Sequence, residues 1–348
     1  MILYFLYASS YFWYFSAKNY KDHIAVLIPI LFFWVMLLSL RSESYGEDIK
    51  YYFYIFIHPE RYYLDEFGLY YFNALLSFFS SEYIWFSLCY SLLINSLLIF
   101  FYRYLDRNAA ILMFLYFCST FIFYQLNLNI FRQGVAVVLV LFSITLFSKH
   151  ASISIMILVL AILFHKAAII GVVFLFFQQF DFKKALIIPT VLLSIFPIGP
   201  DFYAGVAGII GQFIPIMERA LNAYVEMGQQ GLIESSDLNH RNLPIIVTAL
   251  LLLKAKLPEN IRVNSIVWVY ILSLLFSALL TNNVLLYDRV IIFSQLLQPF
   301  VFMLSCKAIF PNRWMVPFIF VAVLQFIFTV SIWGPQNLLP TYDFYKIL

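Results

Sequence analysis

The chain alternates between long apolar runs and short polar breaks. The runs have the length and helical periodicity of membrane-spanning helices, not the two-residue alternation of strands. They predict twelve spans, at about residues 2–16, 24–40, 83–102, 109–125, 133–148, 152–164, 167–180, 185–199, 244–257, 263–280, 287–305 and 315–333. The predicted fold is an all-α integral membrane protein, a polytopic bundle of about twelve transmembrane helices in a single domain over residues 1–348.

The amino-acid composition narrows the class of protein. Hydrophobic residues make up 64% of the chain and charged residues only 11%, which excludes a soluble protein of this length. The formal net charge of +3 is too small to indicate a nucleic-acid partner. The sequence contains no P-loop, GxSxG or HExxH motif and no metal-ligand spacing. We therefore expect neither a cofactor nor a metal.

The distribution of charge sets the orientation. The runs 152–164 and 167–180 could form one helix, but keeping them separate places 12 of the 21 basic residues and only 4 of the 18 acidic ones on one face. The positive-inside rule assigns that face to the cytoplasm. Two long segments, about 41–82 and 200–243, then lie outside. The first contains EFGLYYFNALLSFF, which predicts an interfacial helix, and the second predicts a short helix around 215–227.

Arginines stand at the outer ends of the predicted spans, where the positive-inside rule disfavours basic residues. These positions are Arg41, Arg132 with its neighbour Gln133, Arg241 and Arg289. Guanidinium groups bind phosphate oxygens bidentately and keep their charge, so the arginines together indicate an anionic ligand at the membrane surface. The alternative is that each one reaches lipid headgroups or pairs with Asp48, Glu66 or Asp288.

Three further residues at the predicted outer face are candidates for catalysis. His165 is a candidate general base because its ordinary pKa lies near the working pH; the alternative is an interfacial histidine that only forms hydrogen bonds. Asp48 and Glu66 are candidate carboxylates for orienting a sugar or activating a hydroxyl, whereas most acids of their segment are solvated loop charges. Tyr52 and Trp85 could stack on sugar rings or belong to an interfacial aromatic belt.

Five motifs follow one another from about residue 41 to about residue 300: RSESYGEDIKYYFYIF, DEFGLYYFNALLSFF, NIFRQGVAVVLVLFSI, LAILFHKAAIIGVVF and YDRVIIF. In this order they resemble the EpsG-like family, which includes Wzy-type O-antigen and exopolysaccharide polymerases of bacteria. The pieces RQGVA and LFHKAA are the most specific. The Gly-x-Asp pattern of the family is matched by Gly46-Glu47-Asp48.

The resemblance implies a glycosyltransferase of the GT-C-like type in the bacterial inner membrane. It would polymerise oligosaccharide repeat units carried on undecaprenyl pyrophosphate at the periplasmic face, without cofactor or metal. Donor and acceptor would both be lipid-linked oligosaccharides among the membrane lipids, and a chain-length regulator of the Wzz type is a candidate partner. The arginines would bind the donor pyrophosphate, while His165, Asp48 and Glu66 would serve the acceptor hydroxyl.

Other classes of protein remain as alternatives. An O-antigen ligase would use the same donor but carries a much longer outer loop between late helices. A flippase or other transporter needs a polar path at mid-bilayer, often with broken helices, whereas the charges of this sequence lie at helix ends. A structural assembly partner and an acyltransferase are further alternatives, and the sequence lacks the motif order of the latter.

Overall fold

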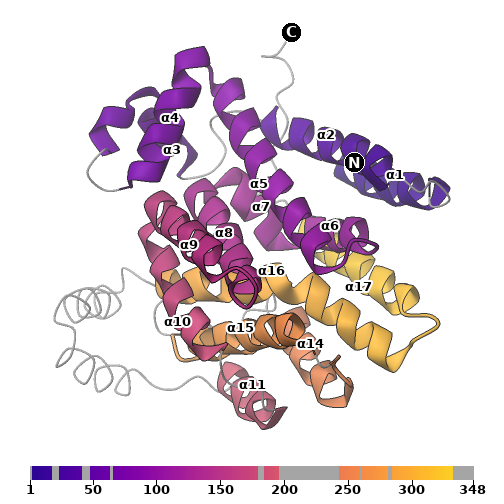
Figure 1. Cartoon of the computed structure of the whole chain (residues 1–348). Coiled ribbons are helices and arrows are strands. Elements are labelled where there is room, and N and C mark those ends of the chain that lie inside the picture. The colour runs from indigo at the N-terminus through magenta and orange to yellow at the C-terminus, as the bar shows by residue number, and fades with distance from the viewer. Residues whose placement is uncertain are drawn as a thin grey trace, which may run out of the picture. The chain divides into compact units, whose positions relative to one another are not determined.

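The computed structural model describes residues 2–17, 23–40, 48–62, 66–178, 184–195, 243–258, 260–280 and 284–331. These residues form 15 α-helices and three short 3-10 helices, and no strand occurs among them (Figure 1). The chain divides into two compact units. The first comprises residues 1–176 and 310–348, and the second comprises residues 177–309.

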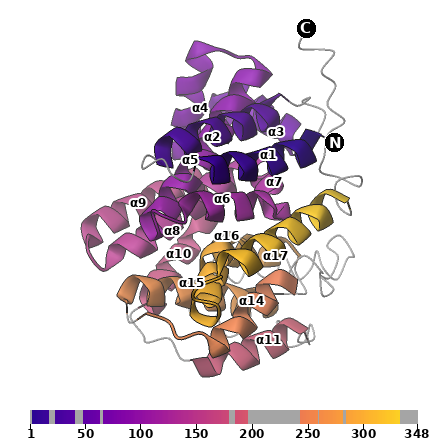
Figure 2. The same cartoon turned by 90° about the vertical axis from the view of Figure 1, so that its right-hand side faces the viewer.

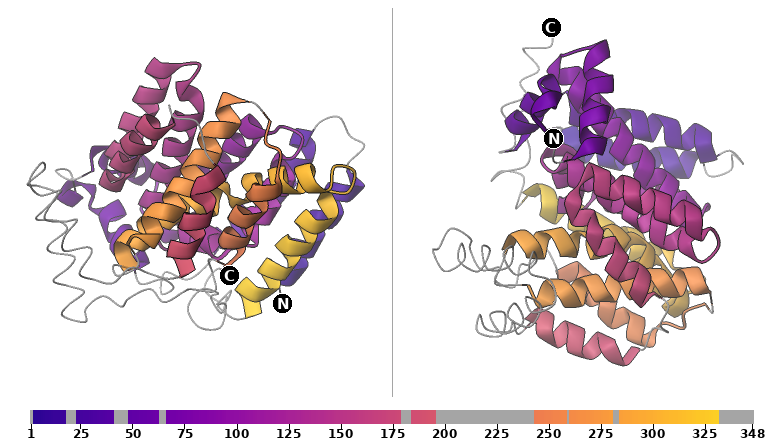
Figure 3. Two further views of the ribbon diagram at one scale, coloured as in Figure 1. Left: turned by 90° about the horizontal axis from the view of Figure 1, so that it is seen from below. Right: turned by 60° about the vertical axis from the view of Figure 1, so that its left-hand side comes forward.

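The first unit is built from helices of both ends of the chain. Its α-helices are α1 (Ile2–Ser16), α2 (His23–Ser39), α3 (Ile49–Ile57), α4 (Phe67–Phe79), α5 (Tyr83–Leu105), α6 (Ala110–Cys118), α7 (Phe121–Leu128), α8 (Phe131–Phe147), α9 (Ala151–Phe164), most of α10 (Ile170–Phe177), and α17 (Met315–Phe328). Helices α8 and α9 lie side by side (Figure 3), as do α1 and α2 (Figure 2). Tyr7 of α1 stacks on Phe326 of α17 with ring centroids 3.9 Å apart, which joins the two ends of the sequence.

The second unit contains α11 (Ile187–Ile195), α14 (Leu243–Lys254), α15 (Ile261–Ala278) and α16 (Val284–Ile309). Helices α15 and α16 pack closely, and the buried hydroxyls of Ser273 and Ser294 lie 2.5 Å apart between them. Lys184, just before α11, donates to the backbone carbonyl of Leu253 near the end of α14 at 3.1 Å. Basic side chains commonly satisfy the last carbonyls of a helix in this way.

The helices lie where the apolar runs were predicted, but most of them are shorter than a full membrane span. Among the described residues, three helices are long and apolar enough to cross a bilayer, namely α5, α15 and the part of α16 from Tyr287 onward. A bent pair of helices raises the number to four, and the further apolar helices have 10–17 residues. The chain is therefore a multi-pass α-helical membrane protein, in which several predicted spans are shorter than the bilayer is thick.

One predicted span is two helices. The run 109–125 was expected to be a single helix, but α6 and α7 meet at an angle of 82°. At the bend the Ser119 hydroxyl bonds the Tyr116 carbonyl at 2.5 Å, and the Thr120 hydroxyl bonds the Phe117 carbonyl at 2.7 Å. Such local bonds compete with helix continuation. The Ser119 carbonyl receives a hydrogen bond from Thr329 at the end of α17, at 2.8 Å.

The first long polar segment also has more structure than its sequence predicts. The helix expected within EFGLYYFNALLSFF is α4, and it is preceded by α3 and by a 3-10 helix at Pro59–Tyr62, neither of which was predicted. The runs 152–164 and 167–180 are separate helices, because α9 ends at Phe164 and His165 is extended. The helix predicted around 215–227 lies outside the described residues.

The bend between α6 and α7 should depend on Thr329. Thr329→Val removes the donor to the buried Ser119 carbonyl, and we expect a loss of about 1–3 kcal/mol of stability, measured by thermal unfolding in detergent micelles. Thr145→Val is the matched control. Thr145 is equally buried, but its hydroxyl only bonds a carbonyl of its own helix, that of Phe142. Equal effects of the two substitutions would contradict the proposed support.

Candidate functional site

Three residues far apart in the sequence meet in the first unit. The Glu66 carboxylate accepts a hydrogen bond from Arg132 Nη1 at 2.6 Å through Oε2, and its Oε1 lies 2.8 Å from His165 Nδ1. Only 5% of the Glu66 side chain is exposed, against 18% for Arg132 and 12% for His165. We call these three residues the Glu66 cluster. It joins an acid, a fixed cation and a titratable ring at a largely buried position.

Each member of the Glu66 cluster lies at the start of a helix. Glu66 immediately precedes α4, and Arg132 is in the first turn of α8. His165 ends α9 and immediately precedes the 3-10 helix Lys166–Ile169, which leads into α10. The free N–H groups at helix starts carry partial positive charge, which adds to that of the Arg132 guanidinium. The surroundings of the Glu66 carboxylate therefore favour an anion.

Helix α4 is held in place by close contacts with α9 and α5. Gly68 lies against the backbone of α9: a Cβ atom at this position would be 3.0 Å from the carbonyl carbon and oxygen of Leu163. Asn73 accepts a hydrogen bond from the Tyr90 hydroxyl of α5 at 2.6 Å. Trp85, which the sequence offered as a sugar-stacking residue, donates to the carbonyl of Leu76 at 3.0 Å. These contacts fix the helix that follows Glu66 directly in the sequence.

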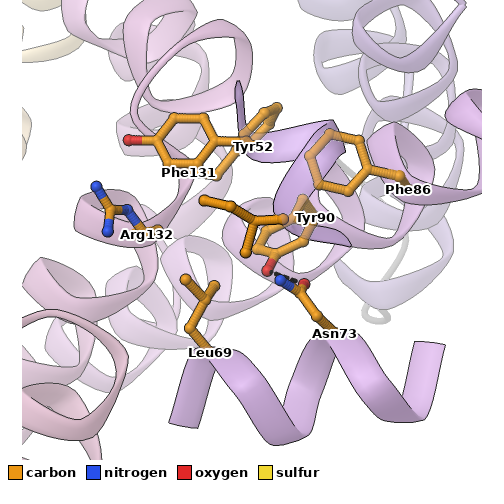
Figure 4. A pocket seen from close by; sticks show the side chains of 8 residues that line it. Tyr52, Leu69, Asn73, Phe86, Tyr90, Phe131 and Arg132 are labelled. Atoms are coloured by element: carbon orange, nitrogen blue, oxygen red, sulfur yellow. Dashed lines mark hydrogen bonds between the residues drawn. The ribbon is translucent and has the colours of Figure 1, made fainter. Parts of the chain in front are cut away.

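Aromatic side chains support Arg132 from the other side. The guanidinium carbon lies 5.0 Å from the centroid of the Tyr52 ring, which is a cation–π contact, so Tyr52 stacks on Arg132 (Figure 4). Burial raises the pKa of Tyr52, which keeps its hydroxyl neutral. The surrounding hollow is lined by Tyr52, Ile55, Leu69, Asn73, Phe86, Tyr90, Phe131 and Arg132. It has no room for a water molecule, so it serves as a packed support for Arg132.

The protonation state of Glu66 decides what the cluster can do. Burial alone would raise the pKa of the Glu66 carboxyl, but the hydrogen bond from His165 and the charge of Arg132 outweigh burial and lower this pKa. Glu66 is thus ionised at neutral pH and poorly suited as a general base, which needs a pKa near the working pH. An ionised carboxylate only accepts hydrogen bonds, so His165 Nδ1 carries a hydrogen. In the neutral ring, Nε2 then holds the lone pair.

The other predicted site residues are not joined to this cluster by the contacts described above. Asp48 is exposed and precedes α3, one turn before Tyr52. Gln133 follows Arg132 in α8 and is half-buried. Arg289 lies in the second turn of α16, in the second unit. Two further predicted residues, Arg41 and Arg241, lie outside the described residues.

Sequence reasoning missed the residues that position the cluster, Gly68, Asn73 and Tyr90. A usable pattern was present, because a glycine and an asparagine interrupt the aromatic run EFGLYYFNALLSFF. Leu69 and Asn73 recur at helical spacing, which places them on one face of α4, and Glu66 immediately precedes that helix. Across the described part of the chain, no three His, Cys, Asp or Glu side chains are grouped as metal ligands.

The fold and the cluster define a multi-pass helical membrane protein with a charged site at helix starts. The chain belongs to the EpsG family, whose model matches residues 2–344. This family is associated with exopolysaccharide synthesis. No curated protein and no solved structure matches the chain.

The contact between α4 and α9 should be sensitive to one methyl group. Gly68→Ala places a Cβ atom against the Leu163 backbone, so α4 must move away from α9, at a cost of about 1–3 kcal/mol in thermal unfolding. Gly134→Ala is the control, because a Cβ atom there meets side chains and no backbone, and its two nearest neighbours are the side-chain ends of Ile94 and Leu126, which can shift. A Gly68→Ala protein as stable as the wild type would show that α4 is not held by this contact.

Proposed function

We propose that this protein is a Wzy-type polymerase, a glycosyltransferase that joins oligosaccharide repeat units carried on undecaprenyl pyrophosphate at the periplasmic face of the inner membrane. Membership of the EpsG family supports the pathway. The observation that carries the reaction type is the Glu66 cluster, which combines a fixed cation with a histidine whose Nε2 is the basic nitrogen. A transfer from a pyrophosphate leaving group to a hydroxyl can use both: the cation for the leaving group and the base for the hydroxyl proton.

The contacts of the Glu66 cluster agree with the proposed twelve-span topology. In that topology Glu66 lies in the first outer segment, Arg132 at the outer end of the fifth span and His165 at the outer end of the sixth. The topology was based on loop charges, which are independent of these contacts. Three residues that touch must lie at one depth of the membrane. Merging the spans around His165 would place that residue inside a helix, whereas the backbone is extended there.

The proposed reaction follows from the positions of these groups. The acceptor hydroxyl oxygen attacks the anomeric carbon of the donor, and the bond from that carbon to the pyrophosphate oxygen breaks with its electron pair on the leaving group. His165 Nε2 takes the hydroxyl proton, and the ionised Glu66 stabilises the resulting imidazolium through Nδ1. Arg132 binds the leaving pyrophosphate, whose negative charge increases as the bond breaks. On sequence grounds alone, the further candidate ligands of the pyrophosphate are Arg41, Gln133, Arg241 and Arg289, and Asp48 is a candidate for orienting a sugar.

The bend between α6 and α7 does not favour a transporter. Bent or broken helices often mark ion and substrate sites in transporters, where the freed backbone lines a polar cavity. Here α6 is buried over its whole length, and protein side chains bond the backbone at the bend: the Phe117 carbonyl accepts from the Thr120 hydroxyl and the Ser119 carbonyl from the Thr329 hydroxyl. The nearby polar contact, from Asn95 to Asn127 at 2.7 Å, joins two uncharged side chains. The charged contacts described above lie instead in the Glu66 cluster.

Deletion of the gene tests the proposed reaction, and re-expression of variants tests Arg132. Without the protein, we expect surface lipopolysaccharide on gels to carry a single repeat unit in place of the ladder.

Arg132→Ala, and Arg289→Ala, should fail to restore the ladder at normal protein level. Lys should restore it only partly because a point charge lacks the bidentate fork. Loss of the single unit as well would indicate a flippase or a ligase, and full activity with Lys at both positions would reduce the arginines to general interfacial charge.

His165→Gln separates the two roles that a histidine can have at this position. Gln keeps a hydrogen-bond donor of similar reach for Glu66 but cannot take up a proton. Loss of a general base typically lowers the rate about 10²–10⁴-fold, which is enough to remove the ladder. We therefore expect an inactive variant that is still inserted in the membrane and still binds the donor lipid. A near-normal ladder would exclude His165 as the base.

A further inference from the structure

Glu66 holds the position at which the cluster would bind a ligand. Its two carboxylate oxygens are each used by one member, Oε2 by Arg132 and Oε1 by His165. An anion that approaches Arg132 or His165 therefore meets a negative charge that is already bound there. The site is also largely withdrawn from water, so the repulsion between that charge and an incoming anion is screened less than at an exposed surface.

We propose that Glu66 is a specificity-determining residue, an internal anion that a ligand must displace from Arg132 in order to bind. The shared chemistry of the ligands is a phosphate group, which can come from a phospholipid headgroup or from a lipid pyrophosphate. A phospholipid phosphodiester carries one negative charge, as the Glu66 carboxylate does. The pyrophosphate of a lipid pyrophosphate carries more negative charge and more acceptor oxygens than this phosphodiester. The carboxylate therefore excludes the abundant headgroups and yields to the pyrophosphate.

The geometry favours replacement of the Glu66 carboxylate at Arg132 by a phosphate over binding of the phosphate beside it. Arg132 presents its Nη1 to Glu66 while its guanidinium plane is held by the Tyr52 ring, so the cation keeps its place when its partner changes. Glu66 lies just before α4 and not within it, so its side chain is not part of a regular turn. A charge-assisted bidentate pair with phosphate can replace the pair with carboxylate at the same guanidinium. Binding specificity then arises because an incoming ligand must compete with the Glu66 carboxylate for Arg132.

The inference rests on the proposed function only for the identity of the natural ligand, and a binding experiment tests it without any turnover. The full-length protein in detergent micelles is titrated with farnesyl pyrophosphate, with and without phosphatidylglycerol in the micelles. We expect wild-type binding to change little when phosphatidylglycerol is added. Glu66→Gln should bind farnesyl pyrophosphate about tenfold more tightly without the phospholipid, because a neighbouring like charge is gone. Phosphatidylglycerol should then compete with it.

Two controls separate this effect from a general change of charge or shape. Glu60→Gln removes an exposed carboxylate of the same segment, which lies 3.6 Å from His58, and it should leave both measurements unchanged. Arg132→Gln combined with Glu66→Gln should abolish the gain. If Glu66→Gln does not give a folded protein, Glu66→Asp replaces it, with a smaller gain expected from a carboxylate that reaches less far.

The outcomes are distinct. Unchanged or weaker binding of farnesyl pyrophosphate by Glu66→Gln, or by Glu66→Asp where that variant replaces it, would overturn the proposal and leave Glu66 as a residue that positions Arg132 and His165. A gain that Glu60→Gln shares, or that survives loss of Arg132, would also overturn it. Deletion of the gene tests the polymerase separately. The binding result can therefore fail while the ladder still depends on the protein, and the ladder can be unaffected while the binding result holds.

Discussion

The ion pair between Glu66 and Arg132, extended by the hydrogen bond to His165, is the buried charge interaction that ties together the starts of α4 and α8 and the end of α9 in the first unit. A charge withdrawn from water requires an opposite charge or several hydrogen bonds, and removing one partner leaves the other uncompensated. This requirement links the first long polar segment to two later helices, over sequence separations of 66 and 99 residues. The same contact that joins these segments brings together the groups that the proposed reaction uses.

Much of the fold could be predicted from apolar run length, because each predicted span overlaps a helix of the structure. The bend at Ser119 and Thr120 could not be predicted, because nothing in the local sequence distinguishes these two residues from the Ser and Thr residues that lie within continuous helices. Its support comes from Thr329, which is 210 residues away in the sequence. The contact of Gly68 with Leu163 is of the same kind. Sequence periodicity shows which face of a helix is apolar, but not which backbone lies against it.

For the site, the charge pattern predicted the side of the membrane but not the partners. Asp48 and Glu66 were equivalent candidates, because both adjoin aromatic runs. The structure separates them, since Asp48 is exposed and Glu66 is buried between two basic side chains. The pairing of an arginine with Glu66 had been the alternative to ligand binding. Under the proposed exchange the two alternatives are compatible: Arg132 would pair with Glu66 while the site is empty and with the anionic ligand once it is bound.

Charge balance connects this exchange with the proposed reaction. With neutral His165, the cluster of Arg132, Glu66 and His165 carries no net charge, which suits a largely buried position. In the proposed reaction, proton uptake by His165 would make the cluster positive at the step in which negative charge develops on the leaving pyrophosphate. A site that was positive throughout would bind phospholipid headgroups as well. In the proposed reaction the extra positive charge would arise only as the proton is transferred, so it would stabilise the transition state more than the bound ground state, which is the condition for catalysis.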